Sequence, residues 1–229
     1  MSAKKFFLSG GGNGEDSKEI EKRFIGSINK TKPILYIPIA INTKKYSYHE
    51  SYKWIKKIFA PFGFDNIIMW TEEDLEKSKN IDPNKFGGVY IGGGNTFYLL
   101  KILKESPMWN FIQQAIEENV PIYGGSAGAV IFARTVIPAL SADSNEVGLK
   151  NFSAMNLLNG YDIWCHYNLS MDEKIKEYIK KYKMKIITLP KNTGLLVEDN
   201  RIEVIGPGSA FVFNENRKEE IKPGNILSS

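Results

Sequence analysis

The chain has 229 residues, of which 42% are hydrophobic and 24% charged, a composition that suits one ordinary α/β domain and excludes a disordered chain. Its 30 basic and 26 acidic residues give a net charge of +4. The basic residues are not concentrated in a stripe with interleaved aromatic residues, as nucleic-acid binding would require. A single cysteine, Cys165, excludes an intrachain disulfide, and no apolar run is long enough for a signal-peptide core or a membrane span, so a cytoplasmic location is expected.

The first two thirds of the chain alternate short apolar runs with longer amphipathic stretches. The short runs predict strands at residues 6–9, 33–41, 66–70, 88–91 and 120–124. The amphipathic stretches predict helices at residues 19–28, 49–59, 72–78, 96–105 and 109–119. Strands that alternate with helices in this way are typical of βαβ units, so the sequence predicts a parallel sheet.

The last third of the chain has a different pattern. A predicted helix at residues 172–182 is followed by short, turn-separated runs at 185–189, 194–197, 201–205 and 210–213. The middle two runs read as a hairpin, which indicates a mixed sheet edge or a small antiparallel unit. With no internal repeat and no low-complexity linker, residues 1–229 are expected to form a single domain.

The first chemical signal is the sequence Gly-Gly-Ser-Ala-Gly at residues 124–128, which satisfies G-x-S-x-G between a strand and an apolar run. In such an elbow the serine sits on a tight turn with its hydroxyl exposed, and the following N–H faces the developing oxyanion. Ser126 is therefore a candidate nucleophile and Ala127 a candidate oxyanion donor. A glycine-rich turn without chemistry is the plain alternative.

A second glycine-rich turn, Gly92-Gly93-Gly94, also leads from a strand into a helix. Its unshielded N–H groups suit an anion. No Gly-Lys-Ser/Thr follows, and Phe97 stands where the third glycine of G-x-G-x-x-G should be. The turn is therefore interpreted as an oxyanion donor rather than a phosphate cradle.

Only two histidines can serve as a base for Ser126. His49 opens a polar helix and suits a surface role, whereas His166 lies at the edge of an apolar strand and is the candidate base. Cys165 precedes it and should point to the opposite face. Asp143 is the first candidate for the acid that orients the imidazole, and Glu146 in the same polar loop is the alternative. Asp162 is disfavoured because the chain between it and His166 is expected to be extended, which would place its carboxylate well away from the ring.

Together these stretches resemble peptidase E, the aspartyl dipeptidase family that also includes cyanophycinases. The resemblance rests on residues 91–100, 125–129, 154–158 and 189–194, and its layout runs from Phe6 to about Phe213. It implies a class I glutamine-amidotransferase-like fold, an αβα sandwich of three layers with a mostly parallel central sheet. It also implies a serine peptidase that cleaves short peptides, typically dipeptides with N-terminal aspartate. The expected mechanism requires no metal or organic cofactor, and both a monomer and a homodimer remain open.

The family's functional residues transfer by position. Ser126 matches the nucleophile and His166 the histidine, and Asp143 falls where the aspartyl dipeptidases carry their proposed third member. Gly94 and Ala127 match the oxyanion donors. Apart from these matched positions, Asn95 and Arg134 are the candidate substrate-binding residues, with Arg134 the available cation for a substrate aspartate.

Three other interpretations remain open at this stage. An α/β-hydrolase esterase fits the elbow, but its histidine should come later in the chain than His166. A glutamine amidotransferase should carry cysteine at the elbow. A non-enzymatic binding domain could keep the same fold. A metalloenzyme is disfavoured because two unclustered histidines and one cysteine cannot supply a usual zinc site.

Overall fold

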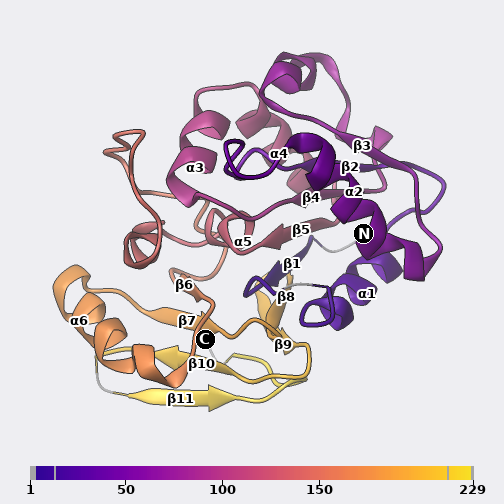
Figure 1. Ribbon diagram of the computed structural model, residues 1–229. Coiled ribbons are helices and arrows are strands. Elements are labelled where there is room, and N and C mark those ends of the chain that lie inside the picture. The colour runs from indigo at the N-terminus through magenta and orange to yellow at the C-terminus, as the bar shows by residue number, and fades with distance from the viewer. Residues whose placement is uncertain (1–3, 13, 216, 228–229) are drawn as a thin grey trace.

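The computed structural model describes residues 4–12, 14–215 and 217–227, which form two sheets with helices around them (Figure 1). Within these residues the large sheet has seven strands in the order β3-β2-β4-β5-β1-β8-β9. Its strands are β1 (Lys5–Ser9), β2 (Ile34–Ile37), β3 (Ile67–Met69), β4 (Gly88–Ile91), β5 (Ile122–Gly125), β8 (Gly194–Glu198) and β9 (Arg201–Ile205). β1 to β5 pair in parallel, and β8 and β9 are added antiparallel beyond β1.

Helices cover both faces of the large sheet. They are α1 (Lys18–Ser27), α2 (Tyr48–Phe59), α3 (Thr96–Lys104), α4 (Met108–Glu117) and α5 (Ala127–Val130). Alternate residues of β1 separate the two faces: Phe7 packs in the cluster that holds α1 and α2, whereas Phe6 and Leu8 pack in the cluster that holds α3, α4 and α5. The large sheet is thus the middle layer of a three-layer αβα arrangement.

The central strands of the large sheet are buried on both faces, as their uninterrupted apolar sequences predict. β2 and β4 are fully buried at every position. β2 ends at Ile37 because Pro38 cannot donate a ladder hydrogen bond, which makes it shorter than the predicted 33–41 strand. Aromatic side chains fill one face, where the rings of Tyr90 and Tyr123 stack 4.3 Å apart.

The second sheet is smaller and has the order β11-β10-β7-β6. Its strands are β6 (Asp162–Cys165), β7 (Ile186–Leu189), β10 (Ala210–Phe213) and β11 (Lys218–Ile221). β6 and β7 are parallel, and the other pairs are antiparallel. The chain leaves the large sheet after β5, returns to it for β8 and β9, and then leaves it again, so the two sheets are interleaved in sequence (Figure 1).

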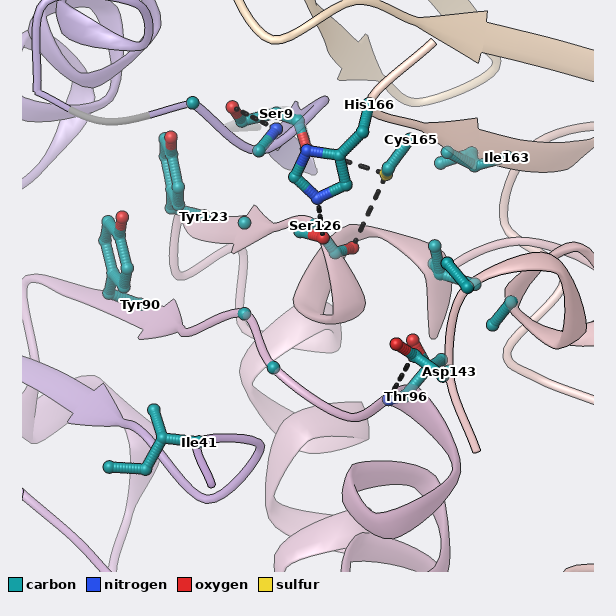
Figure 2. Close-up of a pocket in the computed structure, with 18 of the residues that line it drawn as sticks. Ser9, Ile41, Tyr90, Thr96, Tyr123, Ser126, Asp143, Ile163, Cys165 and His166 are labelled. Carbon is teal, nitrogen blue, oxygen red and sulfur yellow. Dashed lines mark hydrogen bonds between the residues drawn. The ribbon is translucent and has the colours of Figure 1, made fainter. Parts of the chain in front are cut away.

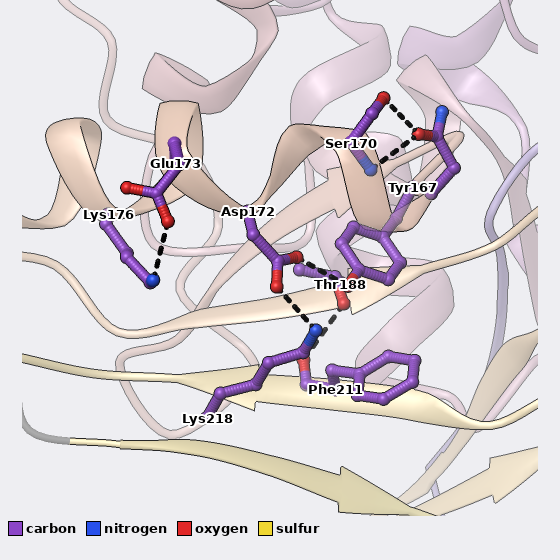
Figure 3. Close-up of polar contacts among 9 residues, drawn as sticks. Tyr167, Ser170, Asp172, Glu173, Lys176, Thr188, Phe211 and Lys218 are labelled. Carbon is purple, nitrogen blue, oxygen red and sulfur yellow. Dashed lines mark hydrogen bonds and ion pairs between the residues drawn. The ribbon is translucent and has the colours of Figure 1, made fainter.

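An ion pair ties helix α6 (Asp172–Tyr182) to the second sheet (Figure 3). Lys218 on β11 lies 2.7 Å from Asp172, and its ammonium stands 4.7 Å from the ring centroid of Phe211 and 5.5 Å from that of Tyr167. The Tyr167 hydroxyl donates to the other oxygen of Asp172 at 2.7 Å. These contacts fasten the segment that directly follows His166.

The predicted elements are largely confirmed, with two differences besides the shorter β2. Residues 72–78 form 3₁₀ turns, Glu72–Asn80, rather than an α-helix, because only Leu75 and Ser78 are buried and there is little apolar face to hold a longer helix. β11 was not predicted. The expected C-terminal hairpin forms as β8 and β9. In the described part of the chain, no helix is long and apolar enough to cross a membrane.

Candidate active site

Ser126 stands on a sharp turn between β5 and α5. Its backbone has φ 48° and ψ −109°, a conformation that non-glycine residues rarely adopt. The turn needs small neighbours, because a Cβ on Gly124 would lie 2.4 Å from the carbonyl oxygen of Gly128. The Ser126 N–H donates to the Ser9 carbonyl at 3.0 Å, which fixes the turn against β1. This is the geometry of a nucleophile elbow.

His166 reaches the nucleophile from the other sheet (Figure 2). It follows β6, has φ 54°, and its N–H donates to the Gly10 carbonyl at 3.0 Å. Its Nε2 lies 2.8 Å from Ser126 Oγ, although the two residues are 40 positions apart in sequence. The structure thus brings together the serine and histidine that the sequence singled out.

The surroundings of His166 favour its neutral form. Partial burial lowers the pKa of the imidazole, the nearby charge of Lys191 lowers it further, and the charge of Asp143 opposes both. A neutral imidazole can accept the hydroxyl proton of Ser126. Burial shifts the pKa of the neighbouring thiol in the opposite direction. It raises the pKa of Cys165 to about 12, so this thiol stays protonated and is a poor nucleophile.

Neither predicted acid touches the imidazole. Asp143 Oδ2 accepts the N–H of Thr96 at 2.8 Å, and Figure 2 shows its carboxylate beside Thr96 and away from His166. Glu146 is exposed and accepts the Ser144 hydroxyl at 3.1 Å. Across the described residues, no hydrogen bond joins a carboxylate to His166. The structure therefore does not bring either acid into the contact that the sequence predicted.

The second glycine turn runs directly beside Ser126. A Cβ on Gly93 would lie 3.2 Å from Ser126 Cβ, and one on Gly94, whose φ is +144°, would lie 1.8 Å from the carbonyl oxygen of Ala40. Only glycine fits such a position. The N–H groups of Gly94 and Ala127 donate to no other described residue. Both are therefore available to a negatively charged oxygen.

Ser126 and His166 open into a cavity of about 780 Å³. One part of its wall is aromatic and includes Tyr36, Trp54 and Tyr123, and another is formed by residues 138–139 and 141–143. The carboxylates that line the cavity belong to Glu50 and Asp143. No lysine or arginine lines it among the residues that the structure describes. The aromatic wall was not predicted, because the residues that form it come from separate elements.

The two predicted substrate-binding residues lie elsewhere. The Asn95 side chain accepts the N–H of Tyr98 at 2.9 Å and donates to the Ser144 carbonyl at 2.8 Å, so it caps α3 and holds the neighbouring loop. Arg134 donates to the fully buried carboxylate of Asp162 at 2.8 Å. Neither residue lines the cavity. Arg134 pairs with Asp162 and not with substrate because a buried carboxylate needs a partner of opposite charge.

The residue that the sequence missed is Lys191. This exposed lysine lies beside the turn that contacts His166, because a Cβ on Gly12 would stand 2.7 Å from the Lys191 carbonyl oxygen. Its charge lowers the pKa of His166. A signal was present: Lys191 lies two residues after the end of β7, and β7 pairs in parallel with β6, which His166 follows, so both residues lie at the same edge of the sheet. No group of His, Cys, Asp and Glu in the described part of the chain could hold a metal ion.

The chain is similar to several known proteins. The pattern of peptidase family S51 matches residues 6–205. Peptidase E from a Nostoc species is 28% identical over 99% of this chain and 96% of that protein. A probable alpha-aspartyl dipeptidase from Drosophila melanogaster is 23% identical, over 84% of this chain and 80% of that protein.

Solved structures show the fold. A putative peptidase E protein from Listeria monocytogenes matches with a TM-score of 0.68 and 22% identity, over 90% of this chain and 100% of that one. A peptidase from an acI-B1 Actinobacterium matches with a TM-score of 0.71 and 18% identity, over 99% and 97%. These likenesses confirm the predicted class I glutamine-amidotransferase-like fold.

Proposed function

The chain belongs to peptidase family S51 and is a serine-type peptidase, and from that premise we propose that Ser126 and His166 hydrolyse short peptides through an acyl-enzyme. One observation carries the proposal: Ser126 Oγ, on its strained turn, lies 2.8 Å from His166 Nε2 at the wall of a cavity that is large enough for a small peptide.

The proposed reaction has two halves. His166 takes the hydroxyl proton of Ser126 as the oxygen attacks the scissile carbonyl, and it then gives that proton to the leaving amine. Water hydrolyses the resulting ester with His166 as base once more. The lowered pKa of His166 supports this role, because the free imidazole is already unprotonated at neutral pH.

Two backbone groups are proposed to hold the oxyanion. The N–H groups of Gly94 and Ala127 belong to the two turns that flank Ser126, and both are unused by the described residues. Loss of one such donor typically costs on the order of 10²–10³ in rate. Any side chain at Gly94 would displace its turn from Ala40, so the donor depends on the glycine.

Asp143, the proposed third catalytic residue, is proposed to act on His166 through its charge and not through a hydrogen bond. Asp143 raises the pKa of His166 by its charge, and it does so without a hydrogen bond to the ring. In this proposal a Ser–His pair carries out the proton transfers, and Asp143 stabilises the imidazolium weakly. Glu146, exposed and bonded to Ser144, is the less favoured acid.

The preference for dipeptides with N-terminal aspartate is proposed with Lys191 as the cation that attracts the substrate side chain. A dipeptidase name among the relatives supports the length of the substrate. The charge of Lys191 acts on His166, whereas Arg134 is already paired with Asp162. Lys191→Met should therefore raise KM for Asp-Leu more than for Ala-Leu, and Arg134→Met should leave that ratio unchanged.

The first experiment is a substrate panel of Asp-Leu, Ala-Leu and p-nitrophenyl acetate with purified protein. Ser126→Ala and His166→Ala should each lower peptide hydrolysis by at least about 10³-fold. His49→Ala is the matched control, because His49 is exposed on α2. Hydrolysis of the ester alone would favour an esterase. Hydrolysis of none of the three substrates would favour a binding domain.

A further inference from the structure

We propose that Asp143 binds the free α-ammonium group of the peptide substrate, and that this residue makes the enzyme specific for unblocked N-termini. The inference rests on the proposed function, because it assigns a part of the same cavity. It gives Asp143 a contact with substrate in place of the contact with His166 that the sequence predicted.

The position of Asp143 supports this role. The residue lines the cavity, and Figure 2 shows its carboxylate on the other side of Ser126 from the imidazole. Oδ2 is held by the N–H of Thr96 at the start of α3, 2.8 Å away. In the part of the chain that the structure describes, no hydrogen bond or ion pair reaches Oδ1. One oxygen is thus fixed and the other is open toward the cavity.

The same segment of chain sets the distance between Asp143 and the oxyanion site. Gly94, the proposed donor, is two residues before Thr96, which anchors Asp143. Asn95 between them donates to the Ser144 carbonyl at 2.8 Å, a second tie between the turn and the Asp143 loop. In a peptide the α-ammonium is one carbon from the first carbonyl. A carboxylate tied to the turn that holds the carbonyl oxygen is therefore well placed for that ammonium.

The charges of the cavity favour the same ligand. Its described lining includes the carboxylates of Glu50 and Asp143 and neither lysine nor arginine. Glu50 belongs to the capping box at the start of α2, where one of its oxygens accepts both the N–H and the hydroxyl of Ser47 at 2.8 Å. Of the two, Asp143 is the carboxylate that Thr96 ties to the turn of the proposed oxyanion donor Gly94, and a carboxylate–ammonium hydrogen bond is among the stronger kinds in proteins.

The test compares Asp-Leu with N-acetyl-Asp-Leu, and uses p-nitrophenyl acetate as a substrate without an amine. The wild-type protein should hydrolyse the free dipeptide with a kcat/KM at least about 10-fold above that of the acetylated one. Asp143→Asn keeps an oxygen for the Thr96 N–H and removes the charge. It should lower kcat/KM for Asp-Leu by about 10- to 100-fold, mainly through KM, and reduce the free-to-acetylated ratio toward one.

Ester hydrolysis separates substrate binding from an effect on His166. If Asp143 binds substrate, Asp143→Asn should lower ester hydrolysis far less than dipeptide hydrolysis. The matched control is Glu105→Gln, which changes an exposed residue at the end of α3. An equal fall for ester and dipeptide would overturn the inference and return Asp143 to the imidazole. If the variant fails to fold, an equal rate of the wild-type protein on both peptides overturns it. Loss of the proposed function has another signature: Ser126→Ala would then match the wild-type protein on every substrate.

Discussion

Gly11 lies directly against the imidazole of His166. A Cβ on Gly11 would stand 2.5 Å from His166 Cε1 and 2.7 Å from Ser126 Cβ, and Gly11 has a φ of +89° that favours glycine. The turn after β1 therefore closes over the nucleophile and its base and leaves room for no further atom there.

Gly11→Ala should lower kcat/KM for dipeptides by at least about 10²-fold, because a displacement of about 1 Å between reacting groups has a cost of that size. The matched control is Gly14→Ala in the same turn, where the new Cβ would meet only Ile58 Cδ1 at 3.6 Å, an ordinary contact. Activity and melting temperature should be measured for both variants. Full activity of Gly11→Ala would show that the turn yields and that the contact with His166 is unimportant.

The acid limb of the pH–activity profile should lie below the ordinary histidine pKa of 6.5. The base must be unprotonated, and burial followed by the charge of Lys191 lowers the pKa of His166, so activity is lost only as pH falls through that lowered value. Lys191→Met removes a cation and should move the limb to higher pH. Lys30→Met, at an exposed position, serves as control. A limb that Lys191→Met leaves in place would mean that another group titrates.

Glu21 should make the fold less stable at alkaline pH. It is 1% exposed, and burial raises its pKa to about 7 from 4.5. Its folded-state pKa exceeds the unfolded value, so its contribution is most favourable below pH 4.5 and is lost as pH rises to about 7. The loss is about 3 kcal/mol, from the usual free energy for each unit of pKa.

Glu21→Gln should therefore stabilise the protein at pH 8 and have little effect at pH 4.5. The amide oxygen can still accept the Ser17 hydroxyl, which lies 3.0 Å from Glu21. Urea unfolding at both pH values measures the difference, with Glu19→Gln on the exposed side of α1 for comparison. Equal effects at the two pH values would show that Glu21 does not titrate in this range.

Lys218→Met should lower the free energy of unfolding by about 1–2 kcal/mol, since it removes a partly exposed ion pair and a cation above three aromatic rings. Lys222→Met, exposed just beyond the same strand, should cost much less. Urea denaturation compares the two variants. If both lose the same amount, the aromatic and acidic neighbours of Lys218 contribute nothing specific.

The nucleophile and base could be predicted because the sequence offers few choices. The elbow at Ser126 needs small residues at fixed spacing, and only two histidines exist to serve it. The alternation of strands and helices could likewise be predicted, because the central strands of the parallel sheet are buried on both faces and therefore apolar throughout. These features are local in sequence, so no knowledge of long-range contacts was needed.

The acid and the cation depended on contacts that the sequence does not display. Arg134 is paired with Asp162, which is fully buried although it stands on an edge strand, and its burial cannot be read from the sequence pattern. Asp143 sits in a loop without periodicity, so its partner, the N–H of Thr96, could not be predicted. β11 was missed because three of its four residues, Lys-Glu-Glu-Ile, are charged, as suits an edge strand.

The nucleophile and base come from different sheets, Ser126 from the end of β5 and His166 from the end of β6. Their 2.8 Å separation exists only when the two sheets are seated against each other. The recovery of catalytic activity can therefore report on the last stage of folding. During refolding, circular dichroism would follow the formation of helices and strands, while the return of peptide hydrolysis would mark the moment at which the two sheets dock.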